Sequence, residues 1–435
     1  MSAAAPLLAV QGIDTGDTAW MLVATALVLM MTPALGLFYA GLVRAKNTLN
    51  TFMMSVGALG VVTVAWAVVG YSLAFDHGNA IVGGLHFAFL HDVAFAPRAG
   101  THIPQLLFMA YEATFCIVTA AIVSGAVVER MRFGAFLTFM VLWSVLVYAV
   151  LAHWVWGGGW LQAHGTLDFA GGVPVEMASG FSAFAAALVV GARRDYGRQA
   201  VLPHNAVYAL LGAGLLWFGW FGFNGGSAYA AGTTGVLAFS NTLLAPACTL
   251  VVWFVLDLAF GGRVTAIGAA TAIVVGCVGI TPAAGYVSPG WAMLLGALAA
   301  LPSYGFIVWR PRTRLDETLD VLAAHGLGGM TGILFVGFAA QLAWNGAGNG
   351  LFYGAAGQLG RQALAALVAP AYAFAATWVI LRVVGLVLPL RVAPREEALG
   401  MDVVQHGEEA YTSGDGAILV TTEAGREGEV AVAQP

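Results

Sequence analysis

Charged residues are what this sequence has least of. Asp, Glu, Lys and Arg together make up 9% of its 435 residues, whereas 60% are hydrophobic. A soluble domain usually carries about 25% charged residues. So few charges cannot cover the surface of a soluble protein of this length, and the mean hydropathy of +0.84 agrees with this. The composition therefore excludes a soluble protein and predicts an integral membrane protein embedded in a lipid bilayer.

Cysteines and targeting signals are also scarce. The three cysteines, Cys116, Cys248 and Cys277, lie inside apolar segments and are not grouped with histidines. Neither a disulfide framework nor a zinc site is therefore predicted, and no motif indicates another cofactor. The amino terminus has no basic region and too short an apolar run for a secretory signal. The net charge of −5 does not indicate a nucleic-acid partner.

Long apolar segments, by contrast, occur along most of the chain. One helical crossing of a bilayer needs about 20 apolar residues. The sequence has about eleven such segments, at roughly 19–43, 50–75, 102–128, 133–155, 173–192, 203–223, 238–260, 264–281, 290–309, 321–341 and 362–390. We predict an all-α polytopic membrane protein of eleven transmembrane helices rather than a β-barrel. The last helix is long and contains Pro370, so we expect it to be tilted or bent.

The loops between these segments fall into two sets by charge. One set has only Arg98 and Arg361 as basic residues. The other set and the carboxyl-terminal tail carry Arg44, Lys46, Arg130, Arg132, Arg193, Arg194, Arg198, Arg263, Arg310, Arg312, Arg314, Arg391 and Arg395. Basic loops face the cytoplasm, which predicts an outer amino terminus and an inner carboxyl terminus. The expected domains are an extracytoplasmic segment (1–18), a transmembrane domain (19–390) and a cytoplasmic tail (391–435).

The stretch from Ala152 to Phe184 contains the residues that packing alone explains least well. A glycine- and aromatic-rich loop holds Trp156 and Asp168, and Glu176 lies just inside the next apolar segment. A carboxylate at membrane depth is costly, so it marks a functional site by default. Glu176 is therefore the strongest candidate for a functional residue on physical grounds.

A second ionisable residue occupies the matching position later in the chain. Glu176 and His325 each begin a span, and each is followed after two residues by a small pair, Ser179-Gly180 or Gly328-Gly329. Two five-helix halves of opposite orientation would form an inverted repeat, with its site near the midplane. This hypothesis places Glu176 opposite His325, where the two could share one proton and titrate as a unit.

Several ordered motifs make the chain resemble the ammonium transporter family (Amt/Mep/Rh) over nearly its whole length. These are GLFYAGLVRAKN at 36–47, AHWVWGGGWL and HGTLDFAGG within 152–172, WFGFNGGS at 220–227, GITPAAGYV at 279–287, HG at 325–326 and MDVVQHGEEAY at 401–411. The resemblance implies a bacterial-type ammonium transporter in the cell (inner) membrane that serves nitrogen assimilation. It also implies a homotrimer in which each protomer has its own pore.

The resemblance implies an outer site and a gate. Trp156 and Ser227, together with Phe115, match the position where the family recruits ammonium, and Phe115 and Phe223 match a stacked aromatic gate below it. Phe115 is placed by its spacing to Glu129-Arg130. An aromatic face attracts a cation by about 0.5–2 kcal/mol, and a serine hydroxyl can accept one N–H bond. Taken alone, each of these aromatics would be an interfacial or core residue.

The resemblance also assigns residues below the gate and beside it. Trp220 and His325 match pore-lining positions. Asp168 matches an acid that orders the vestibule loop, and we expect it to do so by accepting N–H bonds from the glycine-rich turn. The family usually has a histidine where this chain has Glu176, although fungal members with glutamate look similar. The pH response of transport should therefore differ from that of a protein with two pore histidines.

The tail resembles the cytoplasmic tail of the family. Its matching residues are Asp402, His406, Gly407 and Glu408, and in bacterial relatives this tail packs on the inner face of the pore and works with PII signalling proteins. A solvated tail without this role is the structural alternative. The sequence from Thr412 to Pro435 is small, polar and acidic, so we expect it to be disordered.

Other functions stay open on the sequence alone. An ammonium sensor (transceptor) that binds ammonium with little flux is one, and the missing second histidine favours it, whereas the lack of an output domain counts against it. A membrane enzyme using Glu176 and His325 as acid and base is disfavoured, because no nucleophile, metal cluster or phosphate-binding loop accompanies them. Methylammonium and carbon dioxide remain alternative substrates, and the net cargo, ammonia or ammonium, is undetermined.

Overall fold

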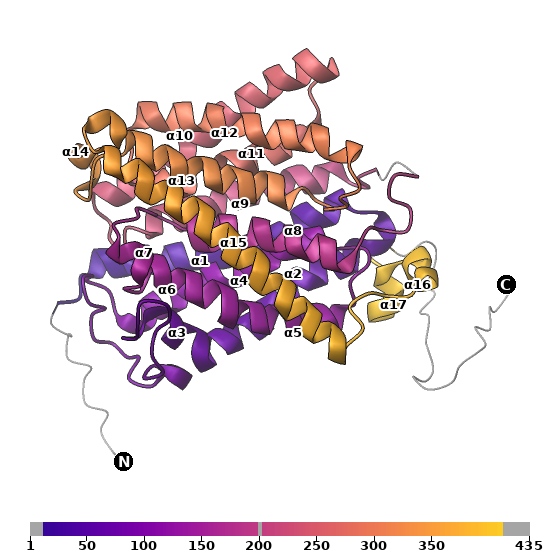
Figure 1. The fold of residues 1–435 in the computed structure, drawn as a ribbon, viewed down its shortest axis with the longest axis horizontal. Coiled ribbons are helices and arrows are strands. Elements are labelled where there is room, and N and C mark those ends of the chain that lie inside the picture. The colour runs from indigo at the N-terminus through magenta and orange to yellow at the C-terminus, as the bar shows by residue number, and fades with distance from the viewer. Residues whose placement is uncertain (1–11, 199–201, 412–435) are drawn as a thin grey trace.

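The computed structural model describes residues 12–198 and 202–411 (Figure 1). The described chain is built of helices: α1 (Thr15–Leu42), α2 (Thr48–Ala65), α3 (Tyr71–Phe75), α4 (Gln105–Val123), α5 (Phe133–Trp143), α6 (Ala149–Trp156), α7 (Trp160–Ala163), α8 (Ala178–Val190), α9 (Ala206–Gly226), α10 (Thr233–Leu256), α11 (Ala266–Ile280), α12 (Pro289–Trp309), α13 (Gly328–Ala339), α14 (Leu342–Asn345), α15 (Ala356–Val387), α16 (Pro394–Leu399) and α17 (Met401–His406). Short 3-10 and π-helical turns join several of them into longer segments.

Eleven of these helical segments are long and apolar enough to cross a membrane, which confirms the predicted fold class. Most ends agree with the sequence-based spans to within a few residues. The fourth span differs most, because it continues through α7 to Ala163 instead of ending at 155. The eleventh begins at Ala356 instead of 362. It contains Pro370 and crosses the other helices obliquely in Figure 1, as expected of a long last helix.

The first helix begins inside the segment that the sequence assigned to the extracytoplasmic end. Asp14 precedes α1, and its side chain accepts the backbone N–H of Asp17 at 2.8 Å. Such a cap satisfies an otherwise unpaired N–H of the first turn, which favours a helix start at Thr15. The predicted disorder of Thr412–Pro435 concerns residues outside those that the structure describes.

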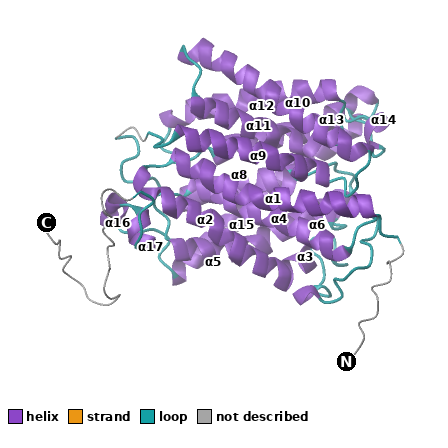
Figure 2. Cartoon of the chain, turned by 180° about the vertical axis from the view of Figure 1, so that it is seen from behind, coloured by secondary structure: helices purple, strands orange, loops and turns teal. Residues whose placement is uncertain are grey.

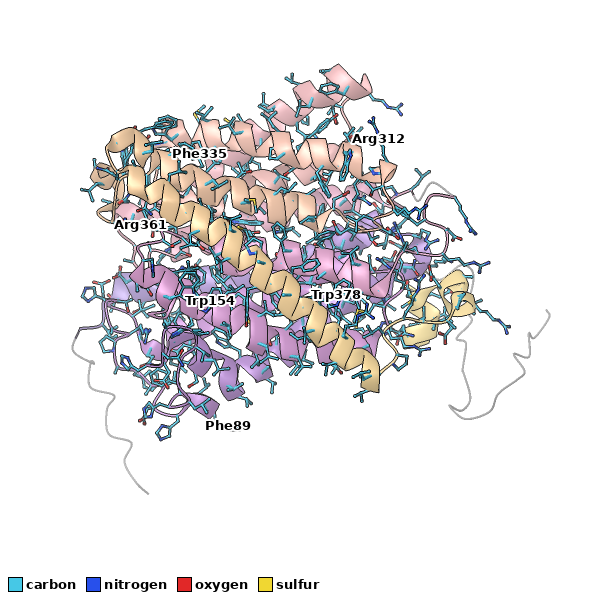
Figure 3. All side chains as sticks on the ribbon, viewed as in Figure 1. Phe89, Trp154, Arg312, Phe335, Arg361 and Trp378 are labelled. Carbon is cyan, nitrogen blue, oxygen red and sulfur yellow. The ribbon has the colours of Figure 1, made fainter. Side chains whose placement is uncertain are left out.

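The tail helices lie at one end of the bundle and the start of α1 at the other (Figures 1 and 2). The basic loops gather around the tail. Arg132 pairs with Glu396 at 3.1 Å, and Arg391 donates to the backbone oxygen of Ala192 at 2.7 Å. Figure 3 shows Arg361 toward the opposite end from Arg312. The two loop sets that the sequence separated by charge therefore occupy opposite ends of the molecule.

The first and sixth spans pack closely, as two related halves would. Gly41 of α1 lies so near the backbone of Ala209 in α9 that an added Cβ would be 2.6 Å from its nitrogen. In return, Gly212 of α9 lies against the backbone of Phe38, where a Cβ would be 2.4 Å from the nitrogen. Small residues allow membrane helices to approach this closely. Glycine on both helices therefore allows the first and sixth spans to cross at close range.

Candidate functional site

Glu176 and His325 meet in the interior of the bundle. Each lies in a π-helical turn at the start of a span, η6 (Gly172–Met177) or η10 (Leu322–Leu327). The Nδ1 atom of His325 is 2.7 Å from Oε2 of Glu176, and the two residues are 3% and 0% exposed. The predicted juxtaposition of these residues is therefore present, although they are 149 positions apart in the sequence.

Small residues make this close crossing possible. Gly180, at the start of α8, lies against the backbone of Gly326, where an added Cβ would be 2.2 Å from the nitrogen. Gly329, at the start of α13, lies against Glu176. A Cβ added to Gly329 would be 2.5 Å from the Cβ atom of Glu176. Each small pair that follows an ionisable residue in the sequence thus accommodates the opposite half of the repeat.

The bond between Glu176 and His325 leaves one acceptor free. Oε1 of Glu176 is buried and has no hydrogen-bond partner among the described residues. A buried polar atom without a partner is costly, and because Glu176 also lines the cavity described below, this oxygen is available to a donor that enters there. The bond itself requires one proton between the two side chains, held either by the imidazole or by the carboxyl group. The shared proton can therefore move between the two side chains without a change in geometry.

A narrow cavity of about 10 Å³ lies beside this pair. That volume holds roughly one molecule the size of water. Its walls are apolar except at the Glu176–His325 pair, and the lining residues are Met31, Leu35, Val118, Ile122, Val175, Glu176, Leu216, Trp220, Phe223, Val274 and His325. The indole N–H of Trp220 donates to Oγ1 of Thr281 at 2.8 Å. Trp220 therefore has no free donor with which to hold a passing molecule.

Phe223 lines this cavity, and Phe115 packs against it. Their ring centroids are 4.0 Å apart with an interplanar angle of 22°, so the rings are stacked. Phe115 comes from α4 and Phe223 from α9, and both are 1% exposed. The structure thus brings together the two phenylalanines that the resemblance assigned to a gate. We call them the gate pair.

Trp156 and Ser227 lie next to the gate pair. The Trp156 ring meets Phe115 edge-on, with centroids 6.4 Å apart. Ser227 donates its hydroxyl to the backbone oxygen of Phe223 at 2.8 Å, which leaves the lone pairs of the hydroxyl available as acceptors. The sequence analysis missed Tyr111, whose hydroxyl oxygen is 3.4 Å from Oγ of Ser227. Its position one helical turn before Phe115 is the signal that could have found it.

Asp168 fixes the loop that carries this outer site. Its carboxylate accepts the backbone N–H groups of Gly171, Gly172 and Val173 at 3.0, 2.7 and 2.7 Å. Its own backbone oxygen accepts the indole N–H of Trp156 at 3.0 Å. Burial raises the pKa of Asp168 to about 6, and the three N–H bonds lower it and offset part of this effect. The group is therefore ionised at neutral pH and orders the turn, as expected.

Comparison with known proteins identifies the family. Residues 19–411 match the model of the Ammonium Transporter Family. The chain belongs to the ammonium transporter family. It is 44% identical over 399 residues to an ammonium transporter of Bacillus subtilis, with 91% of this chain and 98% of that protein covered.

Solved structures agree with this assignment. The fold matches Saccharomyces cerevisiae Mep2 with a TM-score of 0.86 at 34% identity, covering 94% of each chain. It also matches a structure titled Sensor Amt Protein with a TM-score of 0.83 at 28% identity, covering 90% of this chain and 98% of that one. The family model and the Bacillus subtilis relative are both named for ammonium transport, which supports membrane transport as the activity.

This ammonium transporter family member also has a buried ionic cluster at the tail end of the bundle, which the sequence analysis treated only as a topology signal. Glu129 is paired with Arg193 at 2.7 Å and with Arg44 at 2.9 Å. Arg193 also pairs with Asp316 at 2.8 Å. Burial acts to raise the pKa of Glu129, but the charges and hydrogen bonds of the two arginines outweigh it and hold the pKa below its ordinary value.

The tail packs on this cluster. The side-chain amide of Asn47 donates to Glu129 at 2.7 Å, and its oxygen accepts the backbone N–H of Met401 at 2.8 Å. Asp402 accepts the N–H groups of Leu49 and Asn50, at 3.0 and 2.8 Å, in the first turn of α2. The tail residues predicted from the motif therefore reach the ends of the spans on the side of the basic loops.

The remaining tail residues have distinct positions. Nε2 of His406 lies 3.1 Å from Oδ1 of Asn50, and burial lowers the pKa of His406. Gly407 ends α17 with φ of 68°, a left-handed conformation that favours glycine. Glu408 is exposed. Of the four predicted residues, Asp402 and His406 contact the membrane domain, Gly407 ends the helix, and Glu408 faces solvent.

Glu129→Gln should destabilise the protein by about 3 to 5 kcal/mol, because removing one partner leaves buried charges uncompensated. The folded-state pKa of Glu129 lies below its unfolded value of 4.5. The folded state therefore binds this proton less tightly, and its contribution to stability is lost as pH falls below about 4.5. Thermal unfolding in detergent at several pH values measures both effects. An unchanged melting temperature at pH 7 would contradict the prediction.

Proposed function

We propose that this protein recruits ammonium at Trp156 and Ser227, deprotonates it near the gate pair and conducts ammonia through the cavity to Glu176 and His325. We propose that it is a multi-pass protein of the inner membrane, in which residues 19–390 form the channel domain. The observation that supports the proposal is a chain of contacts: Trp156 meets Phe115, Phe115 stacks on Phe223, and Phe223 lines the same cavity as Glu176 and His325. An outer cation site, a stacked aromatic pair, a one-molecule apolar cavity and a buried proton-binding pair follow each other.

The outer site suits a cation that must also leave. Trp156 offers an aromatic face, worth about 0.5–2 kcal/mol to a cation, and Ser227 offers an acceptor for one N–H bond. Ammonium can use both, because it is a cation that also donates hydrogen bonds. Potassium has a similar size but donates none. The site therefore concentrates ammonium weakly and selectively in front of the gate pair.

The gate pair and the cavity favour the neutral species. Moving a bare cation into an apolar passage costs several kcal/mol even after the protein relaxes. Ammonia carries no charge, so its cost is far smaller. We infer that the proton leaves before the nitrogen passes Phe115 and Phe223, and that the proton either remains outside or crosses separately.

The Glu176–His325 pair provides the acceptor on the inner side of the cavity. The free Oε1 of Glu176 can accept an N–H bond from incoming ammonia. The shared proton of the pair makes it suitable for a proton route as well. Co-transport of the proton is therefore chemically available to this protein, and the charge of the pair sets the pH response.

The tail and the oligomer complete the proposal. We propose a homotrimer with one pore per chain, in keeping with the family. The docked tail, held by Asp402 and Asn47, is the proposed contact for a PII signalling protein at the cytoplasmic face. Methylammonium is the proposed alternative substrate, since it retains the charge and N–H donors of ammonium.

Ammonium uptake and current, recorded together in proteoliposomes, test this proposal. We expect the wild-type protein to support uptake at a rate above that of empty liposomes. Uptake with current means that net charge crosses, and uptake without current means net conduction of ammonia. Glu176→His, which restores the usual histidine, should retain uptake with an altered pH profile.

An ammonium sensor is the second candidate function, because the chain resembles a structure titled Sensor Amt Protein. A sensor would bind ammonium without moving it. Binding of ammonium to the purified protein together with no uptake above empty liposomes would contradict the transporter proposal and favour the sensor.

A further inference from the structure

The loop between α3 and α4 brings two imidazoles and a carboxylate together. Nε2 of His86 is 3.2 Å from Oδ2 of Asp92, and Nδ1 of His91 is 3.5 Å from the same oxygen. The ligand atoms of the three residues all lie within 4.8 Å of one another. Phe89, labelled in Figure 3, marks this loop at the edge of the molecule. We call His86, His91 and Asp92 the loop cluster.

The spacing of the loop cluster fits a tetrahedral metal ion. Zinc binds imidazole nitrogen at about 2.0–2.1 Å and carboxylate oxygen at about 2.0–2.2 Å, so neighbouring ligand atoms in a tetrahedron lie about 3.3 Å apart. Two of the three pairs in the loop cluster are already at 3.2 and 3.5 Å. Small side-chain rotations would bring the third pair of ligand atoms, the nitrogens of His86 and His91, to the same spacing. The fourth position is left for water, since the side chains of all three residues are 55 to 64% exposed.

The backbone that carries these ligands is held in place. The N–H of His86 donates to Oδ2 of Asp76 at 2.7 Å, and that of Phe87 donates to Oγ of Ser72 at 3.0 Å. A 3-10 turn over Ala88–Leu90 follows, and the N–H of His91 donates to the backbone oxygen of Ala88 at 3.1 Å. The loop is therefore arranged for binding before a metal arrives, which lowers the cost of ordering the ligands.

We propose that His86, His91 and Asp92 bind one zinc-like divalent cation at the outer surface of this protein. The ordinary explanation is a surface ion pair, but exposed pairs contribute little, and one pair does not require two imidazoles at the same oxygen. Two nitrogen ligands favour zinc, copper or nickel. Calcium and magnesium take oxygen ligands and do not fit. The spacing of the ligands, His-x4-His-Asp, matches no zinc motif, which is why the sequence analysis did not find them.

A metal at this position would brace the outer surface of the bundle. Earlier in the same loop, the backbone oxygen of Ile81 accepts the indole N–H of Trp154 at 2.9 Å. Later in the loop, the backbone oxygen of Ala94 accepts the N–H of Leu106 in α4 at 3.0 Å. The loop thus joins the helix that ends at Trp156 to the helix that carries Phe115. The site itself does not depend on the proposed transport activity.

Calorimetric titration of the full-length protein in detergent with zinc chloride tests the proposal, on protein without a histidine tag. We expect one zinc ion per chain. His86→Ala, His91→Ala and Asp92→Asn should each weaken binding by at least about tenfold, since losing even an outer partner of a metal ligand costs that much. His77→Ala, an exposed histidine of the same loop outside the loop cluster, is the matched control and should bind as the wild type.

Two results would overturn the proposal. One is a wild-type protein that binds no stoichiometric zinc, and the other is retention of wild-type affinity in all three ligand variants. Thermal unfolding without metal checks that the variants fold, which we expect because the altered side chains are exposed. With cobalt in place of zinc, the visible absorption should show a tetrahedral ion in the wild type and in His77→Ala, and not in His86→Ala.

Discussion

Glu176→Gln should lower ammonium uptake by on the order of 100-fold where the released proton crosses through the Glu176–His325 pair, the lower end of what a positioned proton-transfer group contributes. The amide has nearly the shape of the carboxyl group but cannot accept or release a proton. It therefore keeps the packing against Gly329 and a contact with His325, while the shared proton of the pair is lost. Uptake in proteoliposomes, normalised to the amount of reconstituted protein, measures the effect.

The pH profile separates this role from a structural one. Wild-type uptake should depend on pH, because Glu176 and His325 share one proton across their 2.7 Å contact. Glu176→Gln should lose or displace this dependence, because only one titrating group remains. A variant that keeps both the wild-type rate and the wild-type pH profile would show that Glu176 has no part in transport.

Glu112 provides a matched control within the same protein. It is also a buried carboxylate in a membrane span, 1% exposed, but it does not line the cavity below the gate pair. Its Oε1 accepts the hydroxyl of Tyr229 at 2.7 Å, and a glutamine oxygen can do the same. Glu112→Gln should therefore leave uptake close to the wild-type rate, so a large loss in Glu176→Gln would reflect position rather than the mere removal of a buried acid.

Asp168→Ala should lower the free energy of unfolding by about 3 kcal/mol or more. We expect this to exceed the effect of any other single substitution in the loop around Trp156. Hydrogen bonds to a charged group contribute about 1.5–3 kcal/mol each, and a buried N–H left without a partner costs about 1–3 kcal/mol. The variant leaves three such groups, those of Gly171, Gly172 and Val173. The turn also positions Trp156, so ammonium uptake should fall together with the melting temperature in detergent.

Asp168→Asn is the graded control for this prediction. Asparagine has one side-chain oxygen where aspartate has two, so it can keep the bonds to Gly171 and Gly172 and loses the one to Val173. Its loss of stability should lie between those of the wild type and Asp168→Ala. An alanine variant that melts and transports like the wild type would remove Asp168 from any role in the outer loop.

Length and composition were sufficient to predict the membrane class and the number of spans. The thickness of the bilayer imposes a minimum length on every crossing helix, so apolar segments can be counted directly. Helix ends were less accurate, as at Ala163 and Ala356, because the short helix α7 and the polar first turns of α15 lie outside the continuous apolar segments. The pairing of Glu176 with His325 was accessible only because the two halves repeat the same local pattern.

Residues outside the repeated motifs could not be placed from the sequence. The arginines near the tail end were correctly grouped, but their buried partners were missed, because Glu129 and Asp316 come from loops 187 positions apart (316 − 129). Tyr111 was missed for a related reason. The spans are apolar on every side, so their periodicity does not show which face lines the passage.

The sequence by itself determined that this protein is a helical membrane protein with eleven spans and two kinds of loop, since these properties depend on local composition. Only the tertiary structure decided which side chains meet. It stacked Phe115 on Phe223, left one oxygen of Glu176 free below them, and gathered His86, His91 and Asp92 at one point. Such contacts depend on how helices cross and how loops fold back, and a difference of a few ångströms in that packing separates a site from an unrelated set of residues.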